Sequence, residues 1–265
     1  EAAKQANEEL ALLKAAEEER LKAEEAARVK AEEEASREAE KADAEETQSK
    51  ADEEAAFRAR LEKTFVPGAT VSFGHYEQDA NVGSGPEPLE WIVLSYDGQS
   101  AVMITRRAVD TIRYHRPSKA ATWETSNIRQ WLNDTFVADA FTDAERARLI
   151  PETLVNRDVA YGGHIVRGGP DTVDHVWLLS PEELERYLPK NIDRRAEITP
   201  YAESHGGWAN KAGYCYWWLR SPVGGSTYSA KYAAVDGSVS SYAASAETRC
   251  VRPVIRVDVN DPDLF

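Results

Sequence analysis

Hydrophobic and polar positions follow one pattern through about residue 62 and a different one beyond it. The first region consists mainly of Ala, Glu, Lys and Arg without a helix breaker, and opposite charges recur four residues apart, as in Glu18 and Lys22. We predict one long helix that spans roughly 90 Å at ~1.5 Å per residue. Its apolar stripe begins at Leu10, Leu13 and Leu21 and continues only on alanine. Two interpretations remain open: an oligomeric coiled coil with an alanine seam, or a solitary charged spacer.

Alternating and continuous apolar runs predict three strands at the start of the second region. A Pro67-Gly68 turn precedes the alternation of residues 71–73, and two further apolar runs cover residues 89–94 and 101–105. Asp97-Gly98, between the last two runs, is a preferred hairpin turn.

Helix starts are marked by side chains that can accept hydrogen bonds from free backbone N–H groups. Thr125 or Ser126 can cap the helix that follows them, and Thr142-Asp143-Ala144-Glu145 has the pattern of a capping box. Ser180-Pro181 places a cap directly before a proline at the first helical position. We therefore expect two or more helices in the middle of the second region.

Strand patterns dominate the end of the chain, and they cover residues 173–179, 215–219, 232–235, 238–242 and 251–259. The second region therefore runs from strands to helices and then back to strands. This order predicts an α+β fold with a mixed, largely antiparallel sheet. We expect two domains, a helical stalk or coiled coil at residues 1–63 and a globular domain at residues 64–265.

Charge and composition exclude two classes of partner. The chain of 265 residues has a formal net charge of -14 at pH 7, and residues 1–63 contain 12 basic and 20 acidic side chains. Neither region has the basic face that binds phosphates, so we expect no nucleic-acid partner. No apolar run approaches the ~20 residues of a membrane span.

Signatures of catalysis and metal binding are absent from the sequence. It contains no G-x-S-x-G, H-E-x-x-H, Walker or C-x-x-C motif. His164 and His175 flank different elements, and Asp139, Asp143 and Glu145 are interpreted as helix caps and dipole partners. We therefore expect no catalytic residue, no metal and no cofactor.

Two cysteines, Cys215 and Cys250, each lie just before one of two Arg-Pro strings, around Arg220 and Arg252. If these strings are neighbouring strands, the two thiols face each other. A structural disulfide and a pair of buried free thiols both remain open. For Arg220 and Arg252 we expect guanidinium bonds to backbone carbonyls that fix the strand ends, instead of anion binding.

Tryptophan is abundant, and six of the seven indoles lie in apolar periodic segments where burial is expected. Trp208, in a Gly-rich loop, is the one that we expect to be exposed.

A set of motifs recurs in order along the second region: residues 92–94, 122–133, 140–142, 177–180, Trp217-Trp218-Leu219-Arg220-Ser221-Pro222, 235–237 and Val251-Arg252-Pro253-Val254. Together they resemble, over about residues 65–259, a bacterial and phage domain whose members serve as variable proteins of diversity-generating retroelements. The resemblance implies a C-type-lectin-like fold of the formylglycine-generating-enzyme type, used for ligand binding.

In such variable proteins the diversified stretch lies between the Leu-Arg-Ser-Pro and Val-Arg-Pro strings, which here delimit residues 223–249 (the window). Adenine-directed mutation of Asn codons changes exposed side chains there. It reaches neither Lys231 nor Glu247, so we expect these two to be fixed or differently encoded. Tyr and Ser dominate the window as they dominate antibody paratopes. The expected ligand-binding residues are Ser226, Thr227, Tyr228, Ser229, Tyr232, Asp236, Ser238, Ser240, Tyr242, Ser245 and Thr248.

The expected function is therefore that of a ligand-binding display protein, not an enzyme, which recognises a variable protein or a cell-surface ligand. The alternative is a non-diversified structural or enzymatic member of the formylglycine-generating-enzyme-like fold. We expect a fragment or processed form, since the chain begins at Glu1, and a location at the cell surface or outside the cell, with a phage particle or the cytoplasm as the other locations. Homo-oligomerisation through the N-terminal helix is the remaining expectation.

Overall fold

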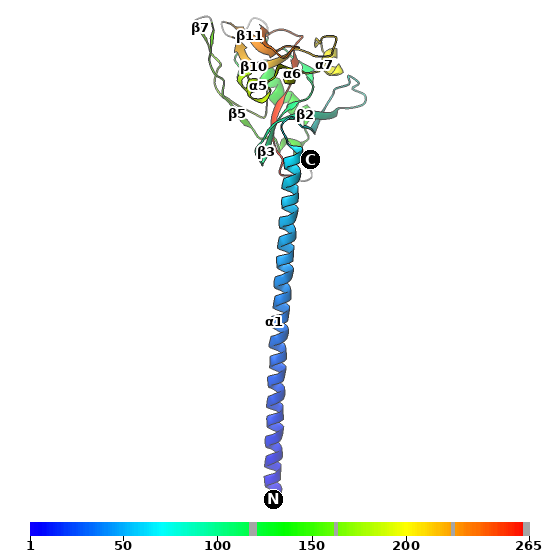
Figure 1. Ribbon diagram of the computed structural model, residues 1–265, viewed down its shortest axis with the longest axis vertical. Coiled ribbons are helices and arrows are strands. Elements are labelled where there is room, and N and C mark those ends of the chain that lie inside the picture. The colour runs from blue at the N-terminus through cyan, green and yellow to red at the C-terminus, as the bar shows by residue number, and fades with distance from the viewer. Residues whose placement is uncertain (117–120, 162–163, 224–225, 262–265) are drawn as a thin grey trace. The chain divides into compact units, whose positions relative to one another are not determined.

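The computed structural model describes residues 1–116, 121–161, 164–223 and 226–261 (Figure 1). The chain divides into two compact units, Glu1–Ala59 and Arg60–Phe265. Helix α1 (Ala2–Thr64) confirms the predicted long helix, and every residue through Ala56 is exposed. The predicted pair of Glu18 and Lys22 forms with a separation of 2.8 Å, one of several such surface pairs that each contribute a few tenths of a kcal/mol. No helix in the described residues is both long enough and apolar enough to cross a membrane.

Two five-stranded sheets form the second unit. The first sheet is antiparallel throughout and has the order β1 (Thr70–Tyr76), β2 (Glu87–Tyr96), β3 (Ser100–Thr105), β14 (Val254–Asp258) and β9 (Val176–Trp177). The second has the order β12 (Val239–Ala243), β11 (Ser226–Ala233), β10 (Trp217–Val223), β13 (Cys250–Val251) and β4 (Asp110–Thr111). Only β10 and β13 run parallel within it. The α+β fold with a mixed, largely antiparallel sheet is confirmed.

Short helices and hairpins complete this unit. The helices are α2 (Asn127–Trp131), a π-helical turn (Leu132–Phe136), α3 (Val137–Ala140), α4 (Asp143–Arg146), α5 (Pro181–Tyr187), α6 (Asn191–Arg194) and α7 (Pro200–Ser204). Two small pairs join β5 (Glu152–Leu154) to β8 (Thr172–Asp174) and β6 (Val159–Tyr161) to β7 (His164–Val166). The predicted caps are confirmed: Ser126 caps α2, and Thr142 and Ser180 each form a complete capping box.

Two predicted strands are each divided between different sheets: residues 173–179 contribute to β8 and β9, and residues 251–259 to β13 and β14. In the second case the break falls at Arg252-Pro253, where proline has no N–H to continue a ladder. The Arg252 guanidinium is fully buried there and donates from Nε to the carbonyl oxygen of Thr105 at 2.7 Å. Arg220, 4% exposed, donates to the carbonyl of Leu178 at 3.2 Å and pairs with Glu183. Both arginines therefore fix strand ends, as expected.

Buried tryptophans join segments that are distant in the sequence. Four of the six expected core indoles are fully buried, and each donates its Nε1–H at 2.7–3.0 Å. The donor and acceptor pairs are Trp91 to Phe73 O, Trp123 to Asp174 Oδ2, Trp217 to Arg194 O and Trp218 to Ile112 O. Satisfying the N–H is what allows so large an aromatic group to be buried without an unpaired donor.

Candidate ligand-binding face

Strand register decides which side chains of the window share a face of the second sheet. Tyr232 on β11 pairs with Ser240 on β12 and with Trp218 on β10, and Ala230 pairs with Tyr242. Directly paired residues lie on the same side of a sheet, and positions two apart along a strand do as well. Tyr232, Ser240 and Tyr242 therefore lie on one face.

Three tyrosine rings gather around one arginine on this face, and a tryptophan stacks on one of them. We call this group the aromatic cluster: Trp208, Tyr216, Tyr232, Tyr242 and Arg249. The Arg249 guanidinium carbon lies 3.6 Å from the ring centre of Tyr242, 4.9 Å from that of Tyr232 and 5.1 Å from that of Tyr216. Trp208 stacks on Tyr216 at 5.0 Å between ring centres. Trp208 and Tyr242 are 45% and 50% exposed, so the cluster presents aromatic surface to solvent.

Arg249 is the buried centre of the cluster, with 7% exposure. Among the residues that the structure describes, no carboxylate oxygen lies within 4.0 Å of it, and its Nε has no hydrogen-bond partner. Its Nη1 donates to Thr248 Oγ1 at 2.9 Å. The tyrosine faces supply the main attraction for its charge, at roughly 0.5–2 kcal/mol per ring.

A cavity of about 710 Å³ has Thr248 in its wall, together with Arg113, Arg116, Asn127 and His205. We call it the Arg116 cavity. Its size is within the range of small-ligand pockets, roughly 300–1,000 Å³.

A buried carboxylate supports His205 at the edge of this cavity. Nδ1 of His205 lies 2.8 Å from Oδ1 of Asp110, and the Tyr76 hydroxyl donates to Oδ2 of Asp110 at 2.8 Å. Burial raises the pKa of Tyr76, and the negative charge of Asp110 raises it further. Tyr76 therefore stays neutral and acts as a donor that holds Asp110 against His205.

The structure brings together only some of the predicted site residues. Four of them lie on the face described above: Tyr228, Tyr232, Ser240 and Tyr242. Thr248 lies near this face, in the wall of the Arg116 cavity, whereas Ser229 pairs with Ala243 on the opposite face. Asp236 and Ser238 bond each other within a turn, with the Ser238 Oγ donating to Asp236 Oδ1 at 2.7 Å, and this bond lowers the pKa of Asp236. Ser245 is half-buried, and the side chains of Ser226 and Thr227 lie outside the described residues.

Several residues of the face were missed by sequence reasoning. The exposure of Trp208 is confirmed, but Tyr216, Arg249, Arg113, Arg116 and His205 carried no motif. Tyr216 had a readable signal, because it stands two positions before Trp218 and so shares its side of the strand. The contacts of Arg113 with Glu247 and of His205 with Asp110 join segments separated by 90 residues or more, which no local pattern reveals.

Both cysteines are free and fully buried, and β10 and β13 place them close together. The hydrogen bond with Cys250, together with burial, raises the pKa of the Cys215 thiol well above its ordinary value. This is the reverse of the depressed pKa that activates a catalytic thiol.

We expect the native protein to react very slowly with a thiol reagent such as Ellman's. Both thiols should react rapidly when the protein is unfolded in concentrated guanidinium chloride. Burial keeps both thiols inaccessible to the reagent, and the raised pKa of Cys215 keeps its thiol protonated. The check is the release of the coloured thiolate in each condition. Fast labelling of the native protein contradicts the buried pair, and no labelling of the denatured, unreduced protein identifies the disulfide instead.

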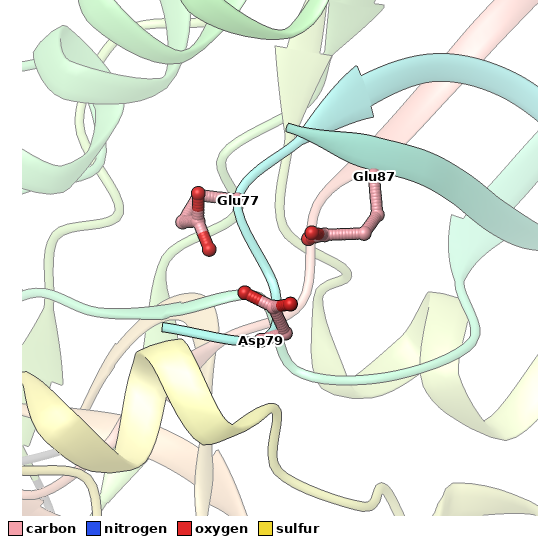
Figure 2. Close-up of side chains that lie close together, drawn as sticks. All are labelled: Glu77, Asp79 and Glu87. Atoms are coloured by element: carbon pink, nitrogen blue, oxygen red, sulfur yellow. The ribbon is translucent and has the colours of Figure 1, made fainter. Parts of the chain in front are cut away.

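One acidic cluster joins β2 to the loop that follows β1. Glu77, Asp79 and Glu87 have carboxylate oxygens within 4.8 Å of one another, and Figure 2 shows the three side chains turned toward a common space. Carboxylates at this spacing are the ligand type that a divalent cation takes. A proton on Glu77 relieves the repulsion between these carboxylates in the same way as a cation. Burial, a hydrogen bond with Asp79 and the charges of Glu87 and Asp79 raise the pKa of Glu77.

A family model described as "Domain of unknown function (DUF6273)" matches residues 99–259, which is more than half of the chain. The match includes β3, all of the second sheet, the aromatic cluster and the Arg116 cavity, and it leaves out α1, β1 and β2. No curated protein and no solved structure matches the chain. The chain belongs to the DUF6273 family, and the candidate ligand-binding face lies within its family domain.

Proposed function

We propose that this chain is a ligand-binding protein whose recognition face consists of the aromatic cluster and the exposed residues of β11 and β12 beside it. The observation that carries the proposal is the half-exposed aromatic surface around the buried Arg249: the Tyr242 ring packs on its guanidinium group, and Trp208 stacks on Tyr216 beside it. Trp, Tyr and Arg are the residues in which protein-binding energy concentrates. Tyr adds broad contact at low entropic cost, with Ser as an adaptable neighbour.

The proposal extends to a variable protein of a diversity-generating retroelement, with a C-type-lectin-like domain that displays residues 223–249. Support comes from the window itself: Tyr228, Ser240 and Tyr242 are exposed, as interchangeable side chains must be. Glu247, which the mutational mechanism does not reach, pairs with Arg113 and so has a structural role. A template repeat matching codons 217–253 beside a reverse-transcriptase gene is the genomic observation that this extension requires.

A binding role is favoured over the enzymatic alternative by the chemistry of the thiols. Cys215 and Cys250 are the nucleophiles that the alternative would use, and both are fully buried. The raised pKa of Cys215 keeps its thiol protonated, whereas the thiolate is the reactive form. We propose that the face acts at the cell surface or outside the cell, on a protein or another cell-surface ligand, and that α1 carries it as a stalk or through self-association.

Replacing three exposed rings together, as Trp208→Ala, Tyr228→Ser and Tyr242→Ser, should weaken ligand binding at least about 100-fold without changing the fold. Tyr232 is left intact because it is half-buried and its ring contacts Trp218 and Tyr216. The ligand is first captured from a cell-surface protein extract with a photo-crosslinking residue at position 242. The purified ligand is then titrated against both proteins by calorimetry.

The matched control removes two apolar side chains that are even more exposed but lie elsewhere, Ile165→Ser and Val173→Ser, which are 71% and 61% exposed. It should bind the ligand as the parent does. Equal binding by the parent and the triple variant, with unchanged unfolding curves, contradicts the proposed face.

A further inference from the structure

The Arg116 cavity points to the chemistry of the partner, and the inference rests on the proposed function of the face beside it. We propose that this cavity accepts a carboxylate, so that the ligand of the face is a protein segment carrying an acidic side chain. The charges in and around the cavity, its hydrogen-bond donors and its size all favour a carboxylate.

Cations are concentrated at this cavity although the globular domain, residues 64–265, is acidic as a whole. Arg113 and Arg116 line the cavity, and Arg113 is ion-paired with Glu247. Arg116 has no ion-pair partner among the described residues. Asp110 is not among the residues that line the cavity, and its Oδ1 lies 2.8 Å from Nδ1 of His205, which does line it. Among the described residues that line the cavity, Glu247 is the only one with a carboxylate, and it is paired with Arg113 instead of Arg116.

Arg249 adds a second, independent cation without a carboxylate. It is 7% exposed, its Nε lacks a hydrogen-bond partner, and Nη1 reaches Thr248, which lines the cavity. A buried charge without a counter-ion is costly, and an anion bound nearby offsets that cost. Arg116 and Arg249 thus both favour an anion at the Thr248 side of the cavity.

The donors around this side suit a carboxylate. Guanidinium groups bind carboxylates through two parallel N–H···O bonds, which are stronger than bonds between neutral groups. Oδ1 of Asn127 accepts a hydrogen bond from the backbone N–H of Arg116 at 3.1 Å, so the side-chain NH2 group of Asn127 remains as a donor. Thr248 contributes a hydroxyl.

The class of partner follows from what adjoins the cavity. About 710 Å³ is more than one side chain fills, so the cavity has room for the tip of a loop that carries the acid. The aromatic cluster, which shares the Thr248 contact, has the Trp, Tyr and Arg composition of protein-binding hot spots. An acidic protein segment is therefore favoured over an acidic sugar. The net charge of -14 repels acidic surfaces in general, so a single cationic cavity also confers selectivity.

The test titrates the full chain with N-acetyl-glutamate amide, and separately with N-acetyl-glutamine amide and glucuronate, while NMR follows the backbone amides of Gly206 and Thr248. We expect saturable shifts with the glutamate probe and at least about tenfold weaker binding of its glutamine counterpart. Arg116→Gln should weaken the glutamate probe at least about tenfold. Arg167→Gln, which removes an arginine that is 86% exposed on a different hairpin, should leave it unchanged.

Three results overturn the inference: no saturable shift with the glutamate probe, equal binding by the Arg116→Gln and Arg167→Gln proteins, or glucuronate binding more tightly than the glutamate probe, which identifies an acidic sugar instead. The small probes do not depend on the natural ligand, so the two proposals fail separately. If Arg116→Gln retains the ligand that the triple ring variant loses, the recognition face stands and the carboxylate site does not.

Discussion

A Glu183→Ala variant should lose about 3–5 kcal/mol of its free energy of unfolding, because it leaves the Arg220 guanidinium buried without a counter-charge. Arg220 is 4% exposed and donates from Nη2 to Glu183 Oε1 at 3.0 Å, while Nη1 bonds Glu183 Oε2. Glu183 also accepts the Ser180 backbone N–H at 2.9 Å in the capping box of α5. One carboxylate therefore joins this helix start to the strand that leads into the window.

Urea unfolding followed by circular dichroism measures this loss, and Glu182→Ala is the matched control. Glu182 is also an acidic residue in the first turn of α5, but it is exposed, so its removal should cost no more than about 0.5 kcal/mol. Adding Arg220→Met to Glu183→Ala should recover most of the lost stability, since it removes the uncompensated charge. A Glu183→Ala protein as stable as the Glu182→Ala protein contradicts the argument.

Gly237→Ala should destabilise the protein by about 2–5 kcal/mol, the sum of left-handed backbone strain and overpacking. Gly237 has φ +83° and is buried in the turn between β11 and β12. A Cβ there would overlap the backbone carbonyl of Asn191, at the start of α6, with 2.5 Å to its carbon atom. Neither the strain nor the overlap can be relieved by a side-chain rotation, because both involve backbone.

Gly213→Ala separates the two contributions. Gly213 has nearly the same φ, +81°, but among the described residues no heavy atom beyond Gly213 and its two chain neighbours lies within 4 Å of a Cβ built there. This variant should lose only about 1–2 kcal/mol, the backbone strain alone. Thermal unfolding of both variants checks the difference, and equal losses would show that the contact with Asn191 carries no cost.

These expectations divide the window into fixed and replaceable positions. Gly237 is held by its conformation, Glu247 by its pair with Arg113 and Arg249 by three rings. Tyr228, Ser240 and Tyr242 are exposed, so substitution there changes the surface that the sheet presents to solvent. The replaceable side chains and the fixed residues that support them therefore lie within the same stretch of sequence.

The sequence by itself determined the features that depend on near neighbours. The long helix follows from helix propensity, the helix starts from Ser126, Thr142 and Ser180, and the burial of most indoles from apolar periodicity. Each depends on groups within about four residues, so the local pattern contains the cause.

Tertiary structure alone decided the composition of the candidate site. Residues 251–259 read as one strand, but Arg252-Pro253 divides them between two sheets. Arg249 carried no motif, and its importance comes from Tyr216, Tyr232 and Tyr242, which three different segments bring to it. Arg116 and Thr248, 132 positions apart in the numbering, share a cavity for the same reason. The packing of distant segments sets which charges remain without a counter-ion, and no local pattern in the sequence encodes that.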